Sequence, residues 1–175
     1  MIDYQTGRMK GFTIPKQFLR LSCEERSKFT REKFSPEPWH LSAYLHYAEN
    51  QDAMAVQVLQ DLIAVYPTES CIHRVIVAEA KGYLGALHCI GNDPASALPL
   101  LTASINDNVD PDRTRRDYQS LMKSAGVYDG QVDGVFGSQS DTAFQSWIGQ
   151  GCPGLADQIS LRRYGPDGSL QMAAH

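Results

Sequence analysis

The sequence predicts a mainly α-helical protein, and three observations support this fold class. Apolar residues recur at three- and four-residue spacing, most regularly at Ala55, Leu59 and Ile63, which is the period of one helix face. Asp-Pro steps at Asp93-Pro94 and Asp110-Pro111 are typical of helix starts. Finally, Pro, Asn and Gly separate the periodic segments, where helices would have to end.

These signals place helices at residues 23–33, 36–49, 53–66, 69–90, 94–105, 113–125 and 140–148. Within the fourth segment, Gly82 and Gly85 each cost about 1 kcal/mol of helix stability, which favours close packing of a neighbouring helix or a kink. Pro99 is expected to bend or delay the helix that follows Asp93. In the tail, residues 165–168 read Gly-Pro-Asp-Gly between two short apolar runs, a signal for a β-hairpin.

Two of the predicted helices repeat each other at an offset of 42 residues. Ala55, Leu59 and Ile63 align with Ala97, Leu101 and Ile105. With the helix before each, the unit is a helical hairpin that resembles tetratricopeptide-type repeats over residues 36–108. The resemblance implies a concave surface that binds a protein partner; an ordinary antiparallel bundle is the alternative.

The most specific stretch is residues 126–137, which carries four glycines and two Asp-Gly steps. Asp-Gly marks tight turns, because Gly reaches positive φ without steric cost. The stretch is therefore predicted to be a twice-turned loop between two helices. Its expected structural turn residues are Gly126, Gly130, Gly134 and Gly137, and its expected apolar anchors are Val127, Val132, Val135 and Phe136.

This loop and its flanking helices resemble the peptidoglycan-binding domain 1 family, a small three-helix module of cell-wall proteins. The resemblance covers residues 113–148 and rests on Tyr118-Gln119, Leu121-Met122, Gly126-Val127-Tyr128-Asp129-Gly130, Val132-Asp133-Gly134, Phe136-Gly137, Ala143 and Trp147. Ser138 and Ser140 depart from the family's usual Pro and Thr. The resemblance implies a non-catalytic site for peptidoglycan or a muropeptide.

Four loop residues are the candidates for contacting this ligand: Tyr128, Asp129, Gln131 and Asp133. Sugar hydroxyls and amides are recognised by an aromatic platform with a few polar groups. Tyr128 is either that platform or part of a small core. Phe136 and Trp147 are expected to be core residues.

Composition excludes some functions. The net charge is −4, which argues against a nucleic-acid partner bound by a basic surface. No apolar run approaches the ~18 residues of a membrane span, and no secretory signal is recognisable. The four cysteines form no C-x-x-C pair and are expected to be reduced and buried. Cys71 and Cys89 cannot bond if residues 71–89 form one helix, because they would lie about 27 Å apart.

The sequence predicts no metal, cofactor or catalytic residue, and the interpretation leans away from an enzyme. Asp129, Gln131 and Asp133 fit the first positions of an EF-hand-like loop, but Ser140 replaces the glutamate that calcium needs. The structural alternative is that Asp129 and Asp133 accept turn amides. The histidines and cysteines show no zinc spacing, and no hydrolase motif is present.

The predicted organisation is a helical domain at residues 1–109, a peptidoglycan-binding-like module at 110–150 and a tail at 151–175. The leading function is non-catalytic cell-wall binding in a bacterial envelope. The alternative is a cytoplasmic interaction protein (an adaptor, chaperone-like or immunity-type factor) that keeps the module as scaffold. A third class, a cell-wall hydrolase, would require His with acidic or Cys side chains in one cleft.

Overall fold

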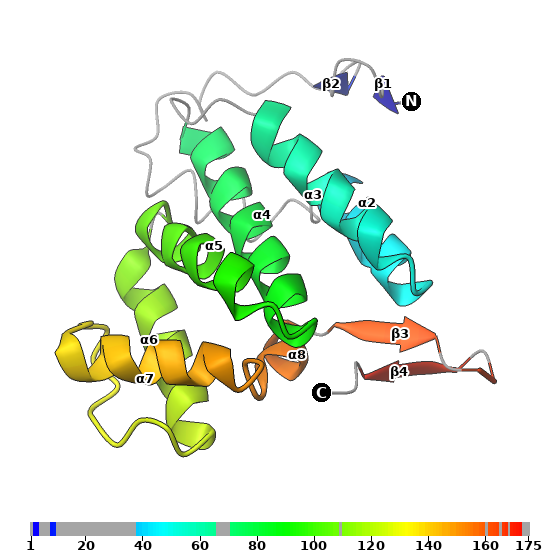
Figure 1. Ribbon diagram of the computed structural model, residues 1–175. Helices are drawn as coiled ribbons and strands as arrows, with labels where there is room; N and C mark the ends of the chain where they lie inside the picture. Colours follow the sequence, from blue (N-terminus) through cyan, green and yellow to red (C-terminus); the bar gives the residue numbers. More distant parts are fainter. Residues whose placement is uncertain are drawn as a thin grey trace.

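The computed structural model describes residues 2–3, 8–9, 38–65, 71–108, 110–159, 161–164, 166–167 and 169–172. Over these residues the protein is mainly helical, as predicted (Figure 1). The helices are α2 (Pro38–Ala48), α3 (Asp52–Val65), α4 (Cys71–Ile90), α5 (Pro94–Asn106), α6 (Pro111–Ser124), α7 (Ser138–Gly149) and α8 (Leu155–Gln158). The helix expected at residues 23–33, with Cys23, lies outside the described residues.

Four short strands form two antiparallel pairs. They are β1 (Ile2–Asp3) with β2 (Arg8–Met9), and β3 (Arg162–Tyr164) with β4 (Leu170–Met172). The second pair is the hairpin that the Gly-Pro-Asp-Gly segment predicted. It lies against the helices, because β3 contacts α2 and the preceding Leu161 is buried with Tyr47 and Ala55.

Helices α2 and α3 and helices α4 and α5 are joined by closely similar turns. Asn50 and Asn92, 42 residues apart, both have left-handed backbones with φ of 61° and 60°. In each turn the next amide donates to a carbonyl five residues earlier, from Gln51 to His46 and from Asp93 to His88, both at 2.8 Å. This is the Schellman helix ending. The 42-residue repeat in the sequence therefore extends to the geometry of the turns.

Close packing of α5 on α4 explains the two glycines of α4. A Cβ atom added at Gly85 would lie 2.8 Å from Leu101 Cγ, and one at Gly82 would lie 2.9 Å from Ser104 Oγ. Both distances are too short for real contacts, so the close-packing interpretation is confirmed. Pro99 does not delay α5, which already begins at Pro94.

The largest core cluster extends over helices α4 to α8. Its centre is aromatic: the Tyr118 ring lies 5.3 Å from Phe144 and 5.7 Å from Trp147, in edge-to-face geometry. Leu101 of α5 and Met122 of α6 are fully buried in the same cluster. The boundary expected near residue 110 coincides with the start of α6, and the apolar core is continuous across it.

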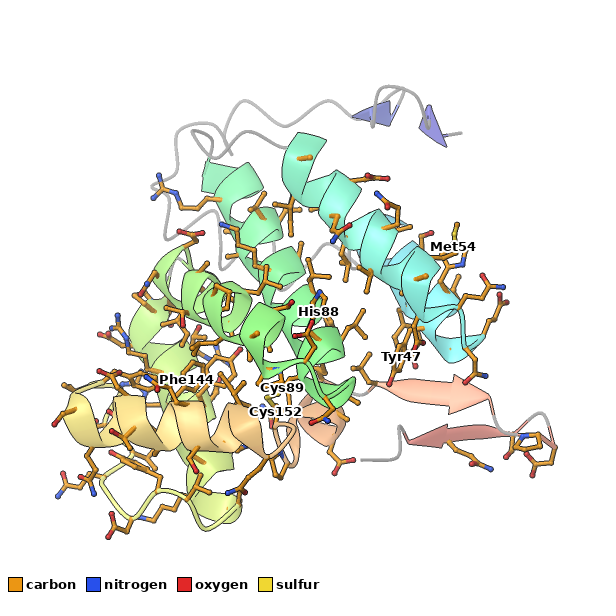
Figure 2. The ribbon with its side chains drawn as sticks, in the orientation of Figure 1. Tyr47, Met54, His88, Cys89, Phe144 and Cys152 are labelled. Atoms are coloured by element: carbon orange, nitrogen blue, oxygen red, sulfur yellow. A yellow bond between two sulfur atoms is a disulfide. The ribbon has the colours of Figure 1, made fainter. Side chains whose placement is uncertain are left out.

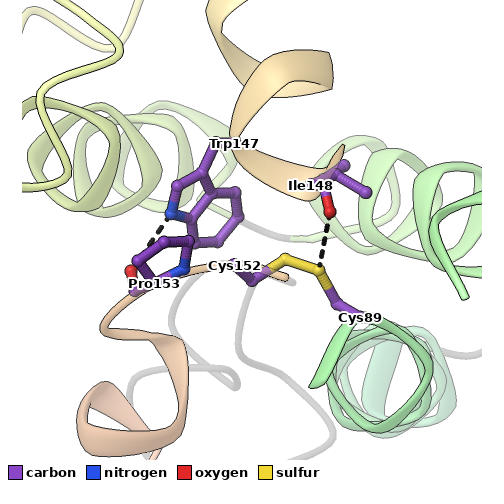
Figure 3. The surroundings of a disulfide bond; sticks show 5 residues. All are labelled: Cys89, Trp147, Ile148, Cys152 and Pro153. Atoms are coloured by element: carbon purple, nitrogen blue, oxygen red, sulfur yellow. Dashed lines mark hydrogen bonds between the residues drawn. A yellow bond between two sulfur atoms is a disulfide. The ribbon is translucent and has the colours of Figure 1, made fainter. Parts of the chain in front are cut away.

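A disulfide bond between Cys89 and Cys152 fastens α4 to the segment after α7 (Figure 3). The two Cα atoms are 5.9 Å apart, and both residues are buried. The prediction that all four thiols are reduced is thus wrong for this pair. Helix α4 does run unbroken from Cys71 to Ile90, which keeps Cys71 away from Cys89 as expected.

None of the helices in the described part of the chain is both long enough and apolar enough to cross a membrane.

Candidate functional site

The loop at residues 126–137 connects α6 to α7 and has the two turns that the sequence predicted. Gly126 ends α6 in a Schellman turn with φ of 75°. Gly134 has φ of 83°, and a Cβ atom there would lie 2.7 Å from the Asp112 carbonyl oxygen of α6. At Gly130 a Cβ would overlap the Tyr128 ring. Gly137 is extended and has open space around it, so the structure shows no comparable need for glycine there.

A buried side chain, Gln119 of α6, holds the loop together. Its Oε1 accepts from the Gly134 amide at 2.8 Å, and its Nε2 donates to the Val135 carbonyl at 2.9 Å. The same Nε2 lies 3.1 Å from Asp133 Oδ1 and 3.4 Å from Tyr128 Oη. Gln119 has no exposed surface, so these contacts are made away from water. Sequence reasoning noted Gln119 only as part of a motif and missed this role.

The two loop carboxylates have different partners. Asp133 accepts from the Val135 amide at 2.9 Å, which is the turn contact expected of it. This bond and the one from Gln119 hold the pKa of Asp133 below its ordinary value. Asp129 accepts from the side-chain amide of Gln139, so the expectation that Asp129 accepts a turn amide is not what the structure shows.

Tyr128 belongs to the core. Only 8% of its surface is exposed, and its hydroxyl donates to the Gln131 carbonyl at 2.9 Å. Of the two roles considered for Tyr128, the structure places the ring in the core and does not present its face as an open platform. Phe136 and Trp147 also pack in the core, as predicted.

The exposed part of the loop carries Asp129, Gln131 and Asp133 together with two valines. Val132 and Val135 are 38% and 67% exposed, so the prediction that they anchor the loop is wrong, whereas Val127 and Phe136 do pack on the core. The sequence between Lys123 and Arg162 contains no Lys, Arg or His. The loop surface is therefore acidic and accepts hydrogen bonds, with a small apolar component.

The described residues contain no group of three or more His, Cys, Asp or Glu side chains that could hold a metal ion. In the EF-hand-like loop, Asp129 and Asp133 are bonded to Gln139, Val135 and Gln119 instead. Cys89, considered as a zinc ligand, is in the disulfide bond.

A cavity of about 440 Å³ lies where the α2–α3 turn meets the α4–α5 turn. His88 Nδ1 lies 3.1 Å from Asp93 Oδ2 at its wall, and Tyr47 and Asp52 also line it. A histidine and carboxylates therefore meet in one cavity, which a hydrolase would require. Cys89 is in the disulfide bond and supplies no nucleophile.

Comparisons of this chain with models of protein families, with curated proteins and with solved structures give no match. The function is therefore argued from the geometry of the loop and from the chemistry of the residues around it.

Proposed function

We propose that this protein is a non-catalytic peptidoglycan-binding protein of the bacterial cell envelope, and that it contacts the wall through the loop at residues 126–137. The observation that carries the proposal is the buried Gln119, which fixes a loop whose outer side chains stay exposed. A loop already fixed in shape loses little conformational entropy when it binds.

The exposed chemistry of the loop suits a muropeptide. Asp129, Gln131 and Asp133 offer carboxylate and amide oxygens, which accept from sugar hydroxyls, amide N–H groups and ammonium groups. Val132 and Val135 offer a small apolar surface beside them. With Tyr128 buried, its proposed role becomes holding the Gln131 backbone in place rather than stacking on a sugar.

The Cys89–Cys152 bond supports the envelope over the cytoplasm. Disulfides persist in oxidising compartments such as the periplasm and the outside of the cell, and are rare in the cytosol. The cytoplasmic alternative is supported instead by the two equivalent helical hairpins, because stacked hairpins form protein-binding surfaces. That alternative needs the disulfide to be absent in the cell.

The first test is co-sedimentation of the purified, oxidised protein with insoluble peptidoglycan sacculi. We expect the wild type to sediment, and Asp129→Ala and Gln131→Ala to weaken sedimentation. Gln145→Ala, at an exposed position of α7 outside the loop, is the matched control and should sediment like the wild type. Tyr128→Ala is avoided, because it would leave a hole in the core.

Two outcomes would reject the proposal. A wild type that stays in the supernatant would make the module a scaffold and move the search to a protein partner of the helical hairpins. Release of soluble muropeptides from the sacculi during the assay would point to the hydrolase class, with His88 and Asp93 as the first residues to replace.

A further inference from the structure

The cavity between the two helical turns is separate from the loop and has a defined chemical character. Its volume of about 440 Å³ lies within the range of small-molecule sites. Val56, Leu87 and Ile90 supply apolar wall, while Tyr47 and His88 supply polar groups. In Figure 2, Tyr47 on α2 and His88 on α4 lie on the side of the molecule where these helices meet.

Two carboxylates give the cavity its charge. Asp52 is the first residue of α3, and Asp93 caps α5 by accepting from the Ser96 amide at 3.1 Å. Hydrogen bonds from Ser96 hold the pKa of Asp93 below its ordinary value, so its carboxylate is ionised at neutral pH. Among the described residues that line the cavity there is no Lys or Arg.

Helix dipoles do not cancel this negative charge. The positive N-terminal ends of α3 and α5 meet at the cavity, and each carries about half a unit charge. The negative C-terminal ends of α2 and α4 meet there too, through Tyr47 and through Leu87 to Ile90. The two pairs of helix ends oppose each other, which leaves the carboxylates as the dominant charge.

We propose that this cavity binds an alkylammonium group, such as a lysine side chain or a free diamino compound. The aliphatic arm would pack on Val56, Leu87 and Ile90, and the ammonium would lie between Asp52 and Asp93. An ammonium group donates three hydrogen bonds and accepts none, so it matches two carboxylates. A neutral alcohol of the same length would gain the apolar contacts only, and a carboxylate would be repelled.

The test is a titration of ¹⁵N-labelled protein with n-pentylammonium, followed by amide chemical shifts. We expect shifts at residues 51–52 and 91–93, with a Kd in the millimolar range typical of so small a ligand. Pentan-1-ol should bind at least about threefold more weakly, because it lacks the charge, and pentanoate should not bind. Separate titrations with Nα-acetyl-lysine N-methylamide and with free lysine distinguish a peptide source from a free amino acid.

Variants at the carboxylates make the test specific. Asp93→Asn keeps the helix cap, since Asn caps as well as Asp, but removes the charge; we expect it and Asp52→Asn each to weaken pentylammonium binding at least about threefold. Asp141→Asn removes an equivalent first-turn charge on α7 and should bind like the wild type. Equal affinity for pentylammonium and pentan-1-ol, no shift at residues 91–93, or unchanged binding by both cavity variants would overturn the proposal. Loop binding to sacculi is unaffected by any of these results.

Discussion

Replacing Gln119 by leucine tests whether one buried side chain organises the candidate loop. Leucine has nearly the same volume but cannot form hydrogen bonds, so the change removes the polar contacts without leaving a large cavity. The Gly134 amide loses its acceptor, and the Val135 carbonyl loses its donor at 2.9 Å. The Val135 carbonyl keeps only a longer contact to Ser140 Oγ, at 3.5 Å.

The expected loss follows from these two groups. A buried amide left without an acceptor costs about 1–3 kcal/mol, and the bond to the partly buried carbonyl adds about 0.5–1.5 kcal/mol. Gln119→Leu should therefore lower the free energy of unfolding by roughly 2–4 kcal/mol. Urea unfolding followed by circular dichroism measures this directly, and hydrogen exchange should show that the Gly134 amide has lost protection.

The matched control is Gln145→Leu, the same chemical change at an exposed position of α7. It should change the free energy of unfolding by no more than about 0.5 kcal/mol. A loss below about 1 kcal/mol for Gln119→Leu, with the Gly134 amide still protected, would show that the loop is held by other contacts and would refute this account.

Three further predictions concern the fold. Replacing Cys89 and Cys152 together by alanine should lower stability by about 4 kcal/mol, because the bond closes a loop across a sequence separation of 63; chemical denaturation with and without reductant measures it. Gly85→Ala should cost about 1–3 kcal/mol by overpacking, whereas Gly149→Ala, with open space around it, should stay within about 0.5 kcal/mol in the same assay. The lowered pKa of Asp133 stabilises the fold above about pH 4, and this contribution is lost as the pH falls through the lowered value. Asp133→Asn should flatten that acid-side loss in unfolding curves measured from pH 2 to 6.

The sequence by itself determined the helices and their ends, because these depend on residues within about five positions of one another. Asp93 and Asp110 cap α5 and α6 through amides three residues ahead. Gly126 ends α6 through its own left-handed backbone. The 42-residue offset also predicted an equivalence that the turns at Asn50 and Asn92 share.

Some loop features were also local and were read correctly, such as the turn contact of Asp133 with Val135. Others were not: periodicity alone did not indicate that Val132 and Val135 would face solvent or that Tyr128 would enter the core. Which side of a loop is buried depends on the helix it packs against, and here that helix is α6, through Gln119.

Only the tertiary structure decided which distant residues meet. The Cys89–Cys152 bond depends on the end of α4 lying beside the segment after α7, and no spacing rule predicts that approach. The same holds for the cavity, where Asp52 and Asp93 come from different hairpins. Both features arise from helix packing, in which buried apolar area fixes positions that no short stretch of sequence specifies.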